Sequence, residues 1–442
     1  MDESSFDERI YRKILHGKRE EAVAAAVLAF RVLGYTRNFD IIACASASVR
    51  RSDDFYLPLR IVHNSKHINT YLEGLQTQLP LLHAASLIAG RDYHAAIGES
   101  GGSLTRNQLM MELVDALNSG EGGRSERIAA EMASRGMKEE LFHIFREESS
   151  RRYSFSGPPL TILNSLRCIS EHEDTLENGS VLMSGCLCGT PVSSDFSAIL
   201  KGLRKDDFPS ERVAENSFIP DEREDMKVIY AVRAGISDVA VNVIKSQLMD
   251  GVAVQHISGL LFTEALRHSL QSNRKGQFEF LIQNLHAALE MERTDDEKSG
   301  ISTMELLLSA AHLTQLATQF APPAAENQGQ YALESALDAI TAGHSQHVIS
   351  ILTGKHSHDV EQKIASFISA LSVKYDQTGP LRELICHVSS SLHGASLSGS
   401  DEAFEAALSE CSDYLAAIFS RNANTGTGVN DIFRKSQVSQ TD

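Results

Sequence analysis

Apolar residues along the chain recur three and four positions apart, which is the spacing of helices that bury one face. Ala-rich and Leu-rich segments with this period fill most of the 442 residues, and the strict alternation typical of β-strands is nearly absent. Several prolines stand where a helix would begin, where the ring is tolerated best. These are Pro58, Pro80, Pro159 and Pro380. The pattern predicts an all-α protein without an extensive sheet.

Four short segments resemble one another, each an apolar turn that ends in glycine. They are residues 14–17, 117–120, 232–235 and 340–343. An Ala- and Val-rich stretch follows each of them and ends at a second glycine, at positions 34, 136, 251 and 354. Glycine commonly ends a helix, so each pair should bracket one. We therefore predict four divergent helical units of roughly 100 residues, arranged as an α-solenoid or repeat bundle. Chance similarity among Ala-rich helices is the competing explanation.

The helical pattern weakens in the middle of the chain, where proline, glycine and charge runs interrupt it. We expect an N-terminal repeat region over residues 1–150, a connector over 151–225 whose loops continue the second unit, and a C-terminal repeat region over 226–420. Residues 421–442 are rich in Asn, Thr, Gly, Ser and Gln, and we expect a disordered tail there.

The composition narrows the classes of partner. Apolar residues make up 42% of the chain and charged residues 22%, as in globular proteins that bury a core. A formal net charge of −17 disfavours binding to nucleic acid or to anionic lipid. No apolar run approaches a membrane span, and residues 1–8 do not resemble a signal peptide. The six cysteines include no C-x-x-C pair, which favours reduced thiols and a cytoplasmic location.

Histidines supply the candidate chemistry. His63, His286 and His387 occupy one equivalent position in three units, and Asn164 holds it in the remaining one. Each histidine follows an apolar residue by about one turn and should point inward. If the units curl around a common axis, the imidazoles could meet at one metal ion, as in helix bundles, and neutral imidazole suits Fe, Zn, Cu or Ni. Further candidate ligands are His67, His83, His312 and His393.

The alternative for each histidine is a core residue that is hydrogen-bonded to a backbone carbonyl or a serine. A second group of histidines, at positions 344, 347, 356 and 358, spreads over about 13 Å or more of helix and fits a solvated helix end better than one ion.

Other motifs lack the context that their chemistry requires. Ser100 lies in a G-x-S-x-G segment, but the nucleophile elbow of hydrolases needs a preceding strand, and the flanking pattern is helical. Glu140 and His143 form a single E-x-x-H, whereas di-iron bundles need two copies. Cys186 and Cys188 fall within the expected connector. Nucleotide-binding loops are absent from the sequence, so no nucleotide cofactor is predicted.

The helix around His63, His286 and His387, followed by Leu-Leu-x-Ala-Ala at 81–85 and 307–311, resembles a repeated region of known proteins. It is similar to the helical region of questin oxidase-like proteins, and to histidine-bearing helical segments attached to some bacterial Rieske-type proteins, over most of residues 10–420. The resemblance implies oxidative ring opening of polycyclic phenolic compounds by histidine-bound non-haem iron, with these three histidines as ligands. The chain departs from it in lacking a Rieske C-x-H motif and in Asn164.

These observations predict a histidine-ligated, metal-dependent oxidoreductase, a non-haem iron oxygenase that acts on an apolar aromatic small molecule, with iron as cofactor. The alternative is a non-catalytic helical-repeat scaffold whose concave face binds a protein partner. Inward-facing histidines favour the enzyme. The lack of carboxylate or cysteine ligands at the matching positions favours the scaffold.

Overall fold

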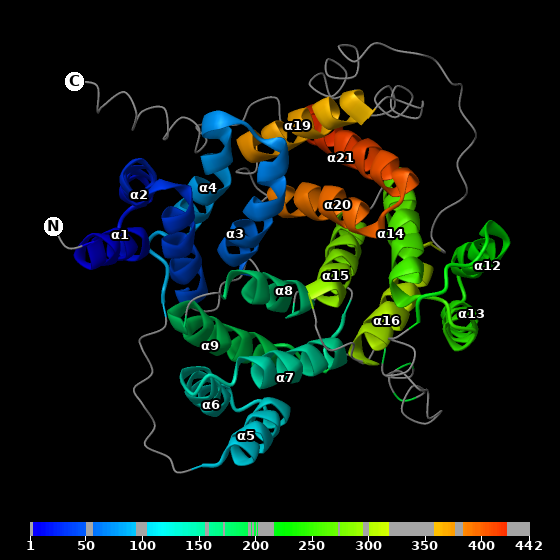
Figure 1. The fold of residues 1–442 in the computed structure, drawn as a ribbon, viewed down its shortest axis with the longest axis horizontal. Helices are drawn as coiled ribbons and strands as arrows, with labels where there is room; N and C mark the ends of the chain where they lie inside the picture. The colour runs from blue at the N-terminus through cyan, green and yellow to red at the C-terminus, as the bar shows by residue number, and fades with distance from the viewer. Residues whose placement is uncertain are drawn as a thin grey trace.

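The computed structural model describes residues 3–49, 56–93, 104–154, 159–170, 173–192, 196, 199, 201, 216–272, 275–294, 300–317, 358–375 and 383–421. Helices account for most of this part of the chain (Figure 1). The β-structure within it is limited to two isolated bridges, Val49 with Tyr93 and Phe218 with Val252. The predicted all-α fold is confirmed.

The helices follow one another in four stretches of the chain. The first contains α1 (Glu3–His16), α2 (Arg19–Ser48), α3 (Leu57–Ile68), the short 3-10 helices η1 (Asn69–Tyr71) and η2 (Gly74–Gln78), and α4 (Leu79–Ile88). The second contains α5 (Arg106–Ser119), α6 (Gly122–Ser134), α7 (Lys138–Arg151), α8 (Pro159–Ile169) and α9 (Glu173–Gly189). The third contains α12 (Glu222–Arg233), α13 (Ser237–Met249), α14 (Val254–Gln271), α15 (Lys275–Thr294) and α16 (Gly300–Ala317). The last contains α19 (His358–Tyr375), α20 (Leu384–Ser398) and α21 (Asp401–Arg421).

Glycines end several of the outer helices, as the sequence predicts. Gly120 and Gly136 bracket α6, Gly235 and Gly251 bracket α13, and all four have positive φ, where a side chain would be strained. Gly34 also has positive φ (82°), but it kinks the long helix α2 rather than ending it. The fourth predicted pair, at positions 343 and 354, lies outside the described residues.

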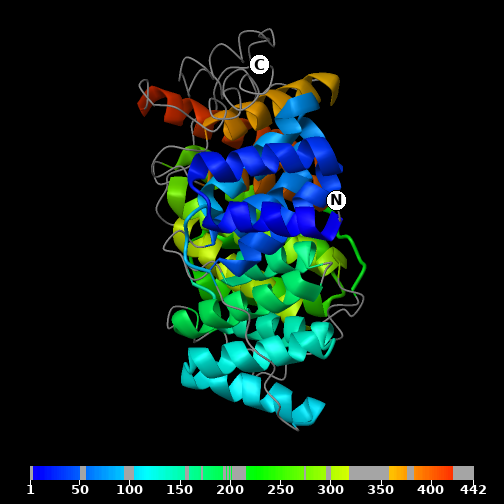
Figure 2. The same cartoon turned by 90° about the vertical axis from the view of Figure 1, so that its left-hand side faces the viewer.

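Four helices close a ring in the middle of the molecule. Helix α3 contacts α8, α8 contacts α15, α15 contacts α20, and α20 contacts α3 again (Figure 1). Each ring helix also packs against the helix that follows it, namely α4, α9, α16 and α21. Helices α5 and α6 form one end of the molecule, and α19 and α21 lie at the other (Figure 2). The ring therefore joins segments from all four stretches around one interior.

The same order of helices recurs in the second and third stretches, and in the first when the two parts of α2 on either side of Gly34 are counted separately. An outer pair comes first, then a further helical segment, then a ring helix, then the helix that packs on it. This order fits the four-unit repeat, which stays a prediction until the units are superposed.

Two of the core helices fall in the stretch 151–225, which we expected to be a connector. Helix α8 buries Leu160, Ile162 and Leu163, and α9 packs closely against it. A Cβ built on Gly179 of α9 would lie only 1.9 Å from Leu166 Cδ1, so glycine permits this approach. The helix start predicted at Pro159 is that of α8. Residues 422–442, the expected tail, lie outside the described part of the chain.

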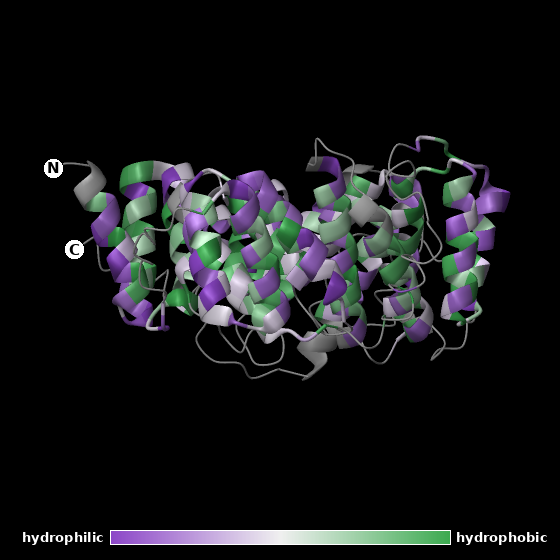
Figure 3. Ribbon diagram, turned by 90° about the horizontal axis from the view of Figure 1, so that it is seen from below, coloured by the Kyte–Doolittle hydropathy of each residue, from purple (hydrophilic) through white to green (hydrophobic). Residues whose placement is uncertain are grey.

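Most helices carry hydrophobic and hydrophilic residues together, as the amphipathic pattern requires (Figure 3). In the described ranges, no helix is both long enough and apolar enough to cross a membrane.

Candidate metal centre

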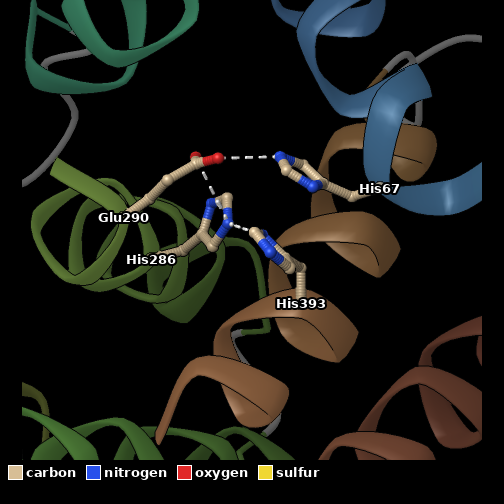
Figure 4. Close-up of side chains that lie close together, drawn as sticks. All are labelled: His67, His286, Glu290 and His393. Carbon is tan, nitrogen blue, oxygen red and sulfur yellow. Dashed lines mark hydrogen bonds and ion pairs between the residues drawn. The ribbon is translucent and has the colours of Figure 1, made fainter. Parts of the chain in front are cut away.

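Four side chains from three helices of the central ring converge on one point (Figure 4). They are His67 of α3, His286 and Glu290 of α15, and His393 of α20. One potential ligand atom of each lies within 4.8 Å of those of the others. Ligand atoms at about 2.0–2.3 Å from a shared ion lie at most about 4.6 Å apart. A small contraction would therefore let one ion contact all four.

The contacts within this cluster join the atoms that would bind a metal. Glu290 Oε1 lies 2.9 Å from His67 Nε2, and Glu290 Oε2 lies 3.7 Å from His286 Nε2. His286 Nε2 is 2.9 Å from His393 Nδ1. The rings of His67 and His393 are stacked, with centroids 3.6 Å apart. Three imidazole nitrogens and a carboxylate thus face a common volume.

Helical spacing places these donors on the inner face of the ring. His286 and Glu290 are four residues apart on α15, so they lie one above the other. On α20, His393 is followed by Gly394, where a Cβ would come within 2.4 Å of Phe262 Cζ on α14. The glycine lets α20 lie close to α14 at the level of His393.

A second group of potential ligands adjoins the first and shares Glu290 with it. It consists of His63 on α3, Cys168 on α8 and Glu290, again with one ligand atom each within 4.8 Å. His63 Nε2 is 3.0 Å from Glu290 Oε2. The two oxygens of this carboxylate therefore face different histidines.

The orientation of the His63 ring is fixed by a serine on α8. Ser165 Oγ donates to the Thr161 carbonyl oxygen across 2.8 Å, so its lone pair accepts from His63 Nδ1 at 3.2 Å. With Nδ1 carrying a proton, Nε2 is the nitrogen that faces Glu290. Such an outer hydrogen bond is how proteins commonly orient a metal-binding histidine.

Glu290 is an anion held by its neighbours. Burial alone would raise the pKa of Glu290, but His63 and then His67 and His286 hold it well below its usual range. Asn164 Nδ2 also donates to Glu290 Oε2 across 2.6 Å. The centre therefore has a fixed negative charge.

Burial favours the neutral form of three of the four central histidines. Burial lowers the pKa of His67, lowers that of His286 well below its usual value, and lowers that of His393 to about 3. Burial would also lower the pKa of His63, but the charge of Glu290 raises it to about 10. Neutral imidazoles keep a lone pair for a metal, whereas a metal would have to displace a proton from His63.

Of the seven predicted ligands, four lie at this centre and three do not. His63, His67, His286 and His393 lie there. His387 does not, because its Nε2 lies 2.9 Å from the Glu410 carboxylate, where both side chains are fully buried. The prediction that His387 shares one point with His63 and His286 is therefore wrong. His387 and His393 are six residues apart on α20 (Leu384–Ser398), and two such positions on a helix point about 120° apart. His393 therefore faces the centre when His387 does not.

The other two predicted ligands are core histidines. His83 of α4 is buried, and burial followed by the charge of Arg19 lowers its pKa to about 3. His312 of α16 lies with Nδ1 3.1 Å from the Tyr153 hydroxyl, and burial lowers its pKa to about 3 as well. Neither belongs to the two ligand groups found among the described residues.

Sequence reasoning missed Glu290 and Cys168. Each stands four residues after an equivalent position, as His67 does after His63, so one helical turn further along was the available signal. The equivalent position itself holds no carboxylate or cysteine, as the sequence shows, and the two donors stand one turn beyond it. Asn164, which replaces a histidine in the pattern, supports Glu290 by its hydrogen bond.

The remaining motifs do not form sites in the described part of the chain. Glu140 pairs with Arg106, and His143 points to solvent. Cys188 lies 3.2 Å from Ser125 Oγ, between α9 and α6. Ser100 and the histidines at 344, 347 and 356 lie outside the described residues, and His358 begins α19.

Comparisons of this chain with protein-family models, with curated proteins and with solved structures found no match. The resemblance to questin oxidase-like proteins stays a prediction.

Proposed function

We propose that the protein is a metal-dependent oxidoreductase that binds a first-row transition metal, iron in the first place, at the centre of the helical ring. The observation that carries the proposal is the convergence of His67, His286, Glu290 and His393. Several imidazoles with one carboxylate are typical ligands of non-haem iron, and they also suit zinc. A six-coordinate ion held by these four groups keeps two positions for water, an oxidant or a substrate.

The positions of the protons favour a bound metal ion over hydrogen bonds among these side chains alone. The Nε2 atoms of His63 and His67 lie 3.2 Å apart, and each also lies within 3.0 Å of a Glu290 oxygen. If both nitrogens donated to the carboxylate, their N–H groups would also face each other. If a metal ion replaced these protons, both Nε2 atoms and the Glu290 oxygens would each direct a lone pair toward it.

The burial of the cluster is suited to a site that exchanges small molecules. The side chains of His63 and His286 are almost completely buried, whereas that of His67 is 15% exposed and His393 is half-buried. The side formed by His67 and His393 is therefore the one from which an ion would enter this group of ligands. An apolar aromatic substrate and a cytoplasmic location remain part of the proposal on the sequence evidence given above.

The scaffold alternative has weaker support. It requires an accessible concave face, but the inner positions of the ring helices, such as Asn164, His286 and Ser389, are buried among one another. Cys168 and Glu290, one turn beyond the equivalent positions, also supply the cysteine and carboxylate donors whose lack favoured the scaffold.

The test is the metal content of protein that is purified without a histidine tag. We expect stoichiometric metal in the wild type and a loss of at least half of it in His286→Ala and His393→Ala. His256→Ala serves as the control, because His256 pairs with Asp225 on the outer side of the array and should retain the metal. Circular dichroism shows whether each variant is folded. Substoichiometric metal that is unchanged in both variants would contradict the proposal.

Dioxygen uptake by the iron-loaded protein with a panel of phenolic compounds then tests whether the protein is an oxidoreductase.

A further inference from the structure

We infer that the centre holds two metal ions and that Glu290 bridges them. This inference rests on the proposed metal-binding function and specifies its site. The first subsite consists of His67, His286, His393 and Glu290, and the second of His63, Cys168 and Glu290.

The position of the shared carboxylate is the first argument. Glu290 Oε1 lies 2.9 Å from His67 Nε2 in the first subsite, and Oε2 lies 3.0 Å from His63 Nε2 in the second. Oε2 also lies 3.7 Å from His286 Nε2 of the first subsite, so the carboxylate stands between the two sets of ligands and is placed to bind two ions. In proteins, paired ions of this kind lie about 3.5–4 Å apart.

The grouping of the donors is the second argument. All ligands of one ion must lie within about 4.6 Å of one another. Among the described residues, the two groups of donors whose ligand atoms lie within 4.8 Å of one another have only Glu290 in common. A single ion in the first subsite would not use Cys168.

The two subsites differ in the ligands that they offer. The first supplies four donors, three nitrogens and an oxygen, so a six-coordinate ion there keeps two open positions. The second supplies only three donors, one nitrogen, one sulfur and one oxygen, so an ion there keeps one more open position, as catalytic sites do. We therefore place substrate binding at the second subsite, next to α8.

The charge balance indicates the chemical class of the ligand that fills this position. Two divalent ions bring four positive charges, and Glu290 with a Cys168 thiolate offsets two of them. An anionic oxygen donor, such as hydroxide or the phenolate of a substrate, would reduce the excess. An anionic oxygen donor is therefore the class of ligand that we expect at this position.

The experiment is a titration of the metal-free protein with Co²⁺, which reports both the number of ions and thiolate ligation. Wild type should bind two Co²⁺ per chain and develop the near-ultraviolet charge-transfer band of a cobalt–thiolate bond. Cys168→Ala should bind one and lack the band. His63→Gln should also bind one, and Glu290→Gln should fall below two because it removes the bridge.

Cys188→Ala is the matched control. Cys188 is also half-buried and lies on α9 near Ser125, and its removal should leave two ions and the band unchanged. Circular dichroism confirms that each variant is folded. One ion per chain in the wild type, with or without the thiolate band, would overturn the two-ion inference and leave the metal-binding proposal standing. No bound Co²⁺ would overturn both.

Discussion

Asn164 of α8 donates a hydrogen bond across 2.6 Å to Glu290 of α15, and so joins two neighbouring helices of the central ring at the candidate metal centre. The amide stands where the sequence pattern has histidine in other units, and its partner is the one carboxylate of the cluster. An outer hydrogen bond of this kind typically orients a ligand and tunes its affinity for metal.

Asn164→Leu should therefore weaken metal binding without removing a ligand. We expect a loss of about 10- to 100-fold in affinity, as for other residues that support a ligand. Competition with a chromogenic chelator measures the affinity. Asn216→Ala is the control, because Asn216 bonds to backbone carbonyls near α13 and should leave the affinity unchanged. Equal affinities for Asn164→Leu and wild type would show that the bond does not support the centre.

Metal should stabilise the folded protein, because the ligands come from helices that are distant in the sequence and meet only when the ring is closed. An ion whose free concentration is 100 times its dissociation constant raises the free energy of unfolding by about 2.7 kcal/mol. Thermal unfolding followed by circular dichroism, with added metal and with EDTA, measures the effect. In Glu290→Gln the two melting curves should nearly coincide. A wild-type melting temperature that does not respond to EDTA would contradict the expectation.

The metal-free protein should lose stability at alkaline pH through His63. Its pKa is raised from 6.5 to about 10 by Glu290, against the effect of burial, so the folded state holds this proton more tightly than the unfolded state. The resulting stabilisation is fully present below pH 6.5 and is lost as the pH rises through about 10. Urea unfolding of metal-free wild type and His63→Gln from pH 6 to pH 10 tests this. The stability difference between the two proteins should shrink over that interval, and a constant difference would exclude the ion pair.

A buried ion pair joins α7 to α16. Arg146 contacts both Glu305 oxygens, at 2.9 and 2.7 Å, and the two side chains are 4% and 0% exposed. Arg146→Met should cost about 3–5 kcal/mol because it leaves the Glu305 charge buried alone, whereas the double variant with Glu305→Leu should recover most of the loss. Urea unfolding measures both changes. Breaking the exposed pair of Arg12 and Glu8 should cost less than about 1 kcal/mol. Additive losses in the double variant would contradict this account.

Local patterns predicted the fold class and the four histidines of the centre, but not Glu290 and Cys168. The helical period and the glycines were sufficient for the all-α class and for α6 and α13, because both depend on residues close in sequence. His63 and His286 were recognised because they occupy equivalent positions in similar helices. These features need no knowledge of which helices pack together.

The remaining features depend on helix boundaries and on distant packing. The pattern predicts both His387 and His393 as ligands, and only the packing of α20 (Leu384–Ser398) determines that His393 faces the centre while His387 faces Glu410. Glu290 was overlooked because a Glu in an amphipathic helix normally faces solvent. Its inward position follows from the closure of α3, α8, α15 and α20 into a ring, which no local pattern specifies.

The most direct test of the central claim is a crystal structure of untagged protein with anomalous diffraction data collected at the absorption edge of the metal that elemental analysis identifies. The account predicts an anomalous peak between α3, α15 and α20, about 2.0–2.3 Å from the donor atoms of His67, His286, His393 and Glu290. Absence of such a peak, with these side chains hydrogen-bonded directly to one another, would contradict it.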